Sequence, residues 1–184
     1  MAAGESALLL ARDRAASRDV SPLEREVVEL FDQLRGKLLR YTLNFGLPVQ
    51  DGEEIIQETF LALFRHLQQG KPRENLRGWV FRVAHNLALK RRASAHFSEA
   101  ELVEETLAFA DPAPDPEAQL AGAQIHQHVL TVFRVLPEQD RRCLILRAEG
   151  LRYREIAQIL GMSLGAVSMS LSRSLARLAR AADR

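Results

Sequence analysis

The stretch Arg154–Leu178, REIAQILGMSLGAVSMSLSRSLARL, has the pattern of two short helices around a turn. Gly161 can take the positive φ of a tight turn, and the small Ala157 four residues earlier lets two helices cross closely. After the turn, apolar residues recur at spacings of three and four, which places them on one stripe facing a core. That predicted stripe is Leu164, Val167, Leu171, Leu175 and Leu178. The stretch therefore predicts a helix-turn-helix.

The opposite face of the second helix suits a DNA major groove. It carries Gly165, Ala166, Met169, Arg173, Ala176 and Arg180, and small residues at its start let a helix lie deep in the groove. From residue 137 to the end, nine arginines oppose five acids, which favours contact with phosphates. Ser168 and Ser170 stand where basic residues commonly bind phosphates, so we expect weak binding by this segment alone. The alternative is a plain helical hairpin whose leucines only form a core.

The rest of the chain also has helical periodicity, and nothing predicts a strand. Ser21, Pro22 and Glu24 form a helix start, with a capping serine, a proline at the first helical position and a glutamate reaching back. Asp51 with Glu54 is expected to cap the second helix. The fold class is all-α, with helices expected over residues 21–45, 51–70, 75–92, 115–136 and 137–150, before the helix-turn-helix.

An acidic segment separates two helical domains. Residues 93–128 contain no lysine or arginine but seven acids, and ADPAPDP at 110–116 is a stiff, extended break. We expect a flexible tail over residues 1–20, a first domain over 21–95, an acidic linker over 96–128 and a second domain over 129–184.

Composition limits the class of protein. The 184 residues are 47% hydrophobic with a formal net charge of +1, which is ordinary for a soluble globular protein. The single cysteine, Cys143, excludes an internal disulfide, fits a reducing compartment and is expected to be a buried structural thiol. No apolar run approaches the roughly 18 residues that span a membrane, and the N-terminus is unlike a signal peptide. We therefore expect a cytoplasmic protein without membrane insertion.

The second predicted helix has two distinctive faces. Its core stripe is expected to be Ile56, Phe60, Leu63, Phe64 and Leu67. The other side combines the acids Glu54 and Glu58 with Ile55 and Leu61, which we expect to be exposed together. Acids on a helix are often simply solvated, but exposed apolar residues among them favour a face that binds a basic protein.

The third predicted helix is strongly basic. Residues 71–92 contain seven basic residues and one acid, and the expected core stripe is Leu76, Val80, Val83 and Leu87. Along one flank lie Trp79, Arg82, Asn86 and Lys90. An aromatic ring, cations and an amide suit single-stranded nucleic acid, with bases stacking on the ring. The alternative is that Trp79 is only a core residue.

Together these motifs resemble a known family. DGEEIIQETFLALFRHL is similar to the core-polymerase-binding helix of bacterial RNA polymerase sigma factors of the extracytoplasmic-function (ECF) type, in the sigma-70 family. LRGWVFRVAHNLALKRR is similar to their promoter-melting helix, and LPEQDRRCLILRAEGLRYREIAQILGMSLGAVSMSLSRSLARL to their terminal domain. The resemblance covers about residues 27–92 and 129–180. It implies a protein that binds core RNA polymerase and directs promoter-specific initiation.

The resemblance also implies three sets of site residues. The clamp of the largest polymerase subunits would be bound by Asp51, Glu54, Gln57, Glu58 and Leu61. The minus-ten element would be melted and held by Lys71, Arg73, Arg77, Trp79, Arg82, Asn86, Lys90 and Arg91. The minus-thirty-five element would be read by Arg154, Gly165, Ala166, Ser168, Met169, Arg173 and Arg177. A weak second domain would gain effective concentration from its tether to the polymerase, and the acidic linker would imitate a transcript in the RNA path.

Two other functions compete with this interpretation. A stand-alone helix-turn-helix regulator would bind duplex DNA without polymerase, but it leaves the first domain and the linker unexplained. An enzyme is disfavoured because no Gly-rich phosphate loop or catalytic set is present, and His126 and His128 face different directions on a helix. We expect no cofactor, no metal and no catalytic residue. An anti-sigma factor remains an open partner.

Overall fold

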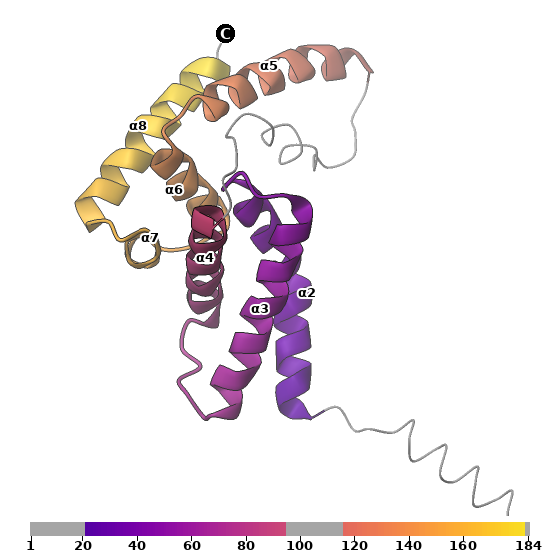
Figure 1. Ribbon diagram of the computed structural model, residues 1–184. Coiled ribbons are helices and arrows are strands. Elements are labelled where there is room, and N and C mark those ends of the chain that lie inside the picture. The colour runs from indigo at the N-terminus through magenta and orange to yellow at the C-terminus, as the bar shows by residue number, and fades with distance from the viewer. Residues whose placement is uncertain (1–20, 95–115, 183–184) are drawn as a thin grey trace, which may run out of the picture.

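The computed structural model describes residues 21–94 and 116–182, with side chains in the first part of α5 described from residue 125 onward. Within these ranges the chain is helical and contains no strand (Figure 1). The helices are α2 (Pro22–Leu43), α3 (Val49–Gln68), α4 (Leu76–Ser94), α5 (Pro116–Arg134), α6 (Glu138–Ala148), α7 (Tyr153–Leu160) and α8 (Leu164–Ala182). The predicted all-α class is confirmed. The predicted tail and residues 95–115 of the predicted linker lie outside the described residues, and α5 begins inside the range predicted as linker.

A side-chain cap sets the start of α2 but not that of α3. At the start of α2 the Glu24 carboxylate accepts from the Ser21 N–H at 2.8 Å, and Ser21 Oγ accepts from the Glu24 N–H at 3.1 Å. This is the predicted capping box. The second helix does not begin at Asp51, because Pro48 is the N-cap and α3 begins at Val49. Asp51 lies in the first turn, where its negative charge interacts favourably with the positive end of the helix dipole.

Helices α2, α3 and α4 pack around a shared apolar core. Gly52 on α3 makes the α2 contact close, since a Cβ at this position would lie 2.9 Å from Leu39 Cδ1. The predicted core stripe of α3 is confirmed, with Phe64 only half-buried. The fully buried apolar side chains of this half include Leu34, Leu38, Tyr41, Ile55, Ile56, Phe60, Leu63, Leu67, Val80, Phe81, Ala84 and Ala88.

The predicted core stripe of α4 is wrong in its angular position. Leu76, Val83 and Leu87 are half-buried, while Phe81 and Ala84 are fully buried beside Val80. The cause is that α4 has neighbours on two sides: α2 and α3 on one, α7 on the other. Its buried face is therefore wider than one row of large apolar residues indicates.

Helices α5 to α8 form the C-terminal half, in which α8 contacts α5, α6 and α7, and α6 also packs against α7 (Figure 1). Gly161 ends α7 with φ 64°, as the tight turn requires. Cys143 is fully buried, as predicted, and its Sγ lies 3.7 Å from Met162 Sδ. Burial raises the pKa of this thiol, which keeps it protonated and unreactive.

The predicted stripe on α8 is correct at Val167 and Leu171, and Leu178 is half-buried against the core, but the prediction is wrong at Leu164 and Leu175. Val167 and Leu171 are fully buried, but the side chains of Leu164 and Leu175 are about half exposed, at 48% and 53%. The buried face continues instead through Ser170 and Ser174. This face turns towards α6, where a buried acid accepts a hydrogen bond from Ser170. A buried serine is therefore favourable here, although its polarity hides it from a hydrophobic pattern.

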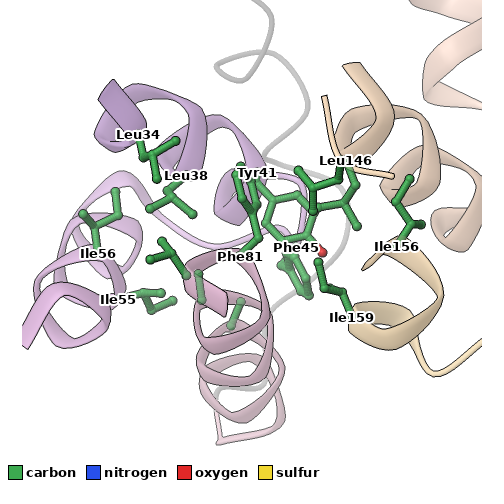
Figure 2. Packing of buried hydrophobic residues seen from close by; sticks show 14 of the residues in the cluster. Leu34, Leu38, Tyr41, Phe45, Ile55, Ile56, Phe81, Leu146, Ile156 and Ile159 are labelled. Atoms are coloured by element: carbon green, nitrogen blue, oxygen red, sulfur yellow. The ribbon is translucent and has the colours of Figure 1, made fainter. Parts of the chain in front are cut away.

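The two halves are packed against each other. Their apolar residues form one continuous cluster, in which Tyr41, Phe45 and Phe81 lie beside Leu146 and Ile159 (Figure 2). The guanidinium carbon of Arg142, on α6, lies 4.1 Å from the centroid of the Phe45 ring, a cation–π contact across the interface.

Candidate protein and nucleic-acid interfaces

One face of α3 combines acids with an exposed leucine. Asp51, Glu54, Glu58 and Leu61 lie one helical turn apart on this face, Gln57 is exposed beside them, and Leu61 keeps 57% of its surface exposed. We call these five residues the acidic face. The prediction that Ile55 belongs to this face is wrong, since Ile55 is 1% exposed. It points into the core where α3 crosses α2 and α4, so Leu61 is the apolar member of the face.

Arg91, predicted as a DNA contact, is bound to the acidic face. Its guanidinium nitrogens lie 2.9 Å from Asp51 Oδ1, 2.9 Å from Glu54 Oε2 and 3.8 Å from Glu58 Oε1. The hydrogen bond with Glu54 is the main cause that raises the pKa of Arg91. The structure thus brings Arg91 to the predicted polymerase-binding set and away from Trp79 and Arg82. Sequence spacing missed this because the contact joins two helices.

The basic flank of α4 is exposed as predicted. Arg82, Asn86 and Lys90 are exposed along it. Trp79 is half-buried, and its ring packs against the ring of His66 with 4.7 Å between centroids. His66 is held there by a 3.0 Å hydrogen bond between Nε2 and the carbonyl of Pro72. Trp79 therefore packs against the edge of the core, and His66 covers part of its ring, so only the remaining part is open to solvent.

A cleft of about 180 Å³ lies where α4 meets α7. The α4 side of this cleft includes Trp79 and Arg82, and the α7 side is formed by Glu155, Gln158 and Ile159. Part of the predicted minus-ten surface therefore faces the C-terminal half. Of the remaining predicted minus-ten residues, Lys71 and Arg73 are exposed in the loop before α4, with Arg73 paired to Glu26, and Arg77 is half-buried.

The predicted DNA-reading face of α8 is open. Gly165, Ala166, Ser168, Met169, Arg173 and Arg177 are exposed, as is Arg154 on α7. Met169 keeps 70% of its surface exposed. Ser163 caps the helix, with its Oγ accepting from the Ala166 N–H at 3.1 Å. At the start of α7, Arg152 donates its backbone N–H to the Glu155 carboxylate.

A buried acid anchors this face from behind. Asp140, on α6, is 4% exposed and accepts a hydrogen bond from Ser170 Oγ at 2.7 Å. Arg173 Nη2 lies 3.1 Å from the second Asp140 oxygen, while 54% of the Arg173 side chain stays exposed. The expectation that Ser170 borders DNA is wrong, because its hydroxyl points inward. Asp140 instead binds both the Ser170 hydroxyl and one terminal nitrogen of the Arg173 guanidinium.

Residues 21–94 and 116–182 meet neither the requirements of a metal site nor those of a single membrane-spanning helix. In these ranges, no group of three or more histidine, cysteine or acidic residues is arranged to hold a metal ion. No single helix there is long and apolar enough to cross a membrane; α7 and α8 reach such a length only as a pair, and they meet at 105°.

Comparison with known proteins identifies the class. The family descriptions Sigma-70 region 2 and Sigma-70, region 4 match residues 30–97 and 126–178. The chain is 34% identical over 135 residues to the ECF RNA polymerase sigma factor ShbA of Streptomyces griseus, covering 71% of this chain and 69% of that protein. It is 29% identical over 148 residues to the RNA polymerase sigma factor CnrH of Cupriavidus metallidurans, covering 76% and 78%.

A solved structure shares the fold. The sigma factor RpoE of Bartonella quintana, in complex with the anti-sigma factor NepR, aligns with a TM-score of 0.58 at 19% identity, covering 85% of this chain and 96% of that one. Regions 2 and 4, in this order, define an RNA polymerase sigma factor. The chain belongs to the ECF group of the sigma-70 family. The predicted family and its function are confirmed, and the alternative of a stand-alone regulator is not supported.

Proposed function

We propose that this sigma factor binds core RNA polymerase through the acidic face of α3. The observation that carries the proposal is the exposure of Leu61 among Asp51, Glu54 and Glu58. More than half of the Leu61 surface is available to a partner, and the acids around it suit a basic partner surface. Arg91 holds two of the acids in fixed positions, so the face is ordered before the partner arrives.

The promoter contacts follow from the other two faces. The α4 flank, with Arg82, Asn86 and Lys90, binds the separated minus-ten strand, and Trp79 offers the uncovered part of its ring to an unstacked base. The exposed face of α8 reads the minus-thirty-five element, with Gly165 and Ala166 permitting close approach and Arg173 reading bases or phosphates. Catalysis belongs to the polymerase, and the protein acts in the cytoplasm. An anti-sigma factor would cover one of these faces.

Titration of labelled protein with core RNA polymerase tests the polymerase face. We expect Leu61→Lys combined with Glu58→Lys to weaken binding by at least about tenfold, which corresponds to about 1.4 kcal/mol. Both side chains are exposed, so the fold should persist, as circular dichroism can check. The matched control is Glu29→Lys, which reverses an exposed acid on α2 and should leave affinity unchanged. Equal binding by the variant and the control would place the polymerase contact elsewhere.

A further inference from the structure

Three cationic side chains from the N-terminal half surround one carboxylate of the C-terminal half. Lys37 and Arg40 come from α2, Arg77 comes from α4, and the carboxylate is that of Glu149 at the end of α6. The N–O distances to Glu149 are 3.6 Å from Lys37, 3.3 Å from Arg40 and 3.9 Å from Arg77. The Glu149 side chain is only 11% exposed, whereas each cation keeps about 40%. The carboxylate therefore lies within a cluster of three cations.

Glu149 does not fully satisfy this cluster. One carboxylate faces three positive charges, which leaves a local excess of positive charge. The Arg77 Nε is buried without a hydrogen-bond partner. A phosphate group presents more acceptor oxygens than a carboxylate and matches guanidinium donors well. The cluster thus has the composition of a phosphate site and holds a carboxylate in its place.

The packed arrangement is too small to read both promoter elements. This step rests on the proposed function. The minus-ten and minus-thirty-five elements are centred about 25 base pairs apart, which is roughly 85 Å along B-DNA. A compact chain of this length has a radius of gyration of about 16 Å, which for a sphere corresponds to a width of roughly 40 Å. The two halves must separate to contact both elements, and separation withdraws Glu149 from the three cations.

We propose that Lys37, Arg40 and Arg77 form a binding site for a DNA backbone phosphate, which Glu149 occupies while the two halves are packed. Glu149 then acts as an internal competitor of DNA. Once the halves separate, the cluster takes a phosphate beside the α4 flank and adds affinity that does not depend on sequence. Lys37 and Arg40 belong to none of the predicted site sets, because only the fold brings α2 beside Arg77.

The test measures binding of the full chain to a fluorescent 30-base-pair duplex of arbitrary sequence, without polymerase, between 50 and 200 mM salt. Glu149→Gln removes the competing charge and should bind the duplex about tenfold more tightly than wild type at 50 mM salt. In the Glu149→Gln background, replacing Lys37, Arg40 and Arg77 by glutamine should abolish the gain. It should also flatten the salt dependence, because three phosphate contacts account for about a 40-fold loss of affinity over this range.

Matched controls separate the site from general charge. Glu29→Gln makes the same charge change on exposed α2 and should leave duplex affinity near that of wild type. In the Glu149→Gln background, Arg65→Gln removes an exposed cation of α3 and should leave the salt dependence nearly unchanged. Salt dependence that is equal with and without the three cations would overturn the proposal, as would a Glu149→Gln protein that binds no more tightly than wild type. Both measurements are made without polymerase. A failure of the protein to bind polymerase would therefore count against the proposed function and not against this phosphate site.

Discussion

Tyr41 and His85 share a buried hydrogen bond between α2 and α4. Tyr41 Oη and His85 Nδ1 are 2.7 Å apart, and His85 is 5% exposed. Burial, together with the positive charge of Arg142, lowers the pKa of His85 to about 4. Burial likewise raises the pKa of Tyr41. Both groups are therefore neutral in the folded protein at neutral pH, and a proton on His85 would be costly.

Stability should therefore depend on His85 in mildly acidic solution. The unfolded chain takes up the histidine proton near pH 6.5, and the folded chain does so only near pH 4. The free energy of unfolding is thus fully retained above pH 6.5 and falls as the pH drops towards 4, by about 3 kcal/mol in total. Urea unfolding at pH 7.0 and 5.5 measures the fall.

Two glutamine variants make this pH prediction specific. His85→Gln should be less stable at pH 7.0 but lose much less stability between the two pH values. His66→Gln, which removes the half-buried histidine packed against Trp79, should retain the wild-type difference. A His85→Gln protein with the full pH dependence would show that other groups cause it.

Ser168 and Ser170 are two residues apart and have opposite environments. Ser170 donates to buried Asp140, whereas Ser168 is exposed on the proposed DNA face. Ser170→Ala removes a hydrogen bond to a buried carboxylate and should cost about 1.5–3 kcal/mol of unfolding free energy. Ser168→Ala should change it by less than about 0.5 kcal/mol. Thermal or urea unfolding of both variants provides the comparison, and similar losses would contradict the buried network.

Short-range chemistry sets several of the helix boundaries. The capping box at Ser21 and the turn at Gly161 were predictable because each depends on residues within four positions. The start of α3 was not, since Pro48 has no side-chain cap and Asp51 is a better capping residue. Capping preference ranks residues by their side chains. Pro48 is the N-cap for a different reason, because its backbone is extended, with φ at −58°.

Two glycines of the helix-turn-helix should respond oppositely to alanine. Gly161 has φ 64°, so Gly161→Ala places a Cβ in a left-handed conformation and should cost about 1–2 kcal/mol. Gly165 lies in the first turn of α8 with nothing near its Cβ position, so Gly165→Ala should add about 0.5 kcal/mol. Chemical unfolding measures both. A loss at Gly165 comparable to that at Gly161 would show that the φ of Gly161 is not the cause.

Sequence patterns indicated which residues are apolar but not which helices meet. Ile55 lies beside acids in the sequence, yet it is buried because α3 contacts both α2 and α4. Leu164 and Leu175 fit a helical stripe and remain exposed. The pairs Arg91–Asp51 and Arg173–Asp140 join residues 40 and 33 positions apart. Periodicity describes one helix at a time, so contacts of this kind could not be predicted from it.

Because the two halves contact each other, we expect them to unfold in one transition, and we expect this coupling to depend on Arg142. Arg142 lies over Phe45 and is paired with Glu138, and its side chain is 12% exposed. Trp79, the single tryptophan, reports on the N-terminal half beside α7, while far-UV circular dichroism reports on all helices. In the wild type, we expect both signals to follow one urea transition, because one apolar cluster links the halves.

Arg142→Glu removes the cation–π contact, worth about 0.5–2 kcal/mol, and places a carboxylate near Glu138. The halves should then unfold separately, with the Trp79 transition at a different urea concentration from that of the circular dichroism signal. Arg154→Glu makes the same charge reversal on an exposed part of α7 and should leave the two curves superimposed. Superimposed curves for Arg142→Glu as well would mean that the apolar contacts alone hold the halves together and that the polar layer around Arg142 contributes little to the packed state.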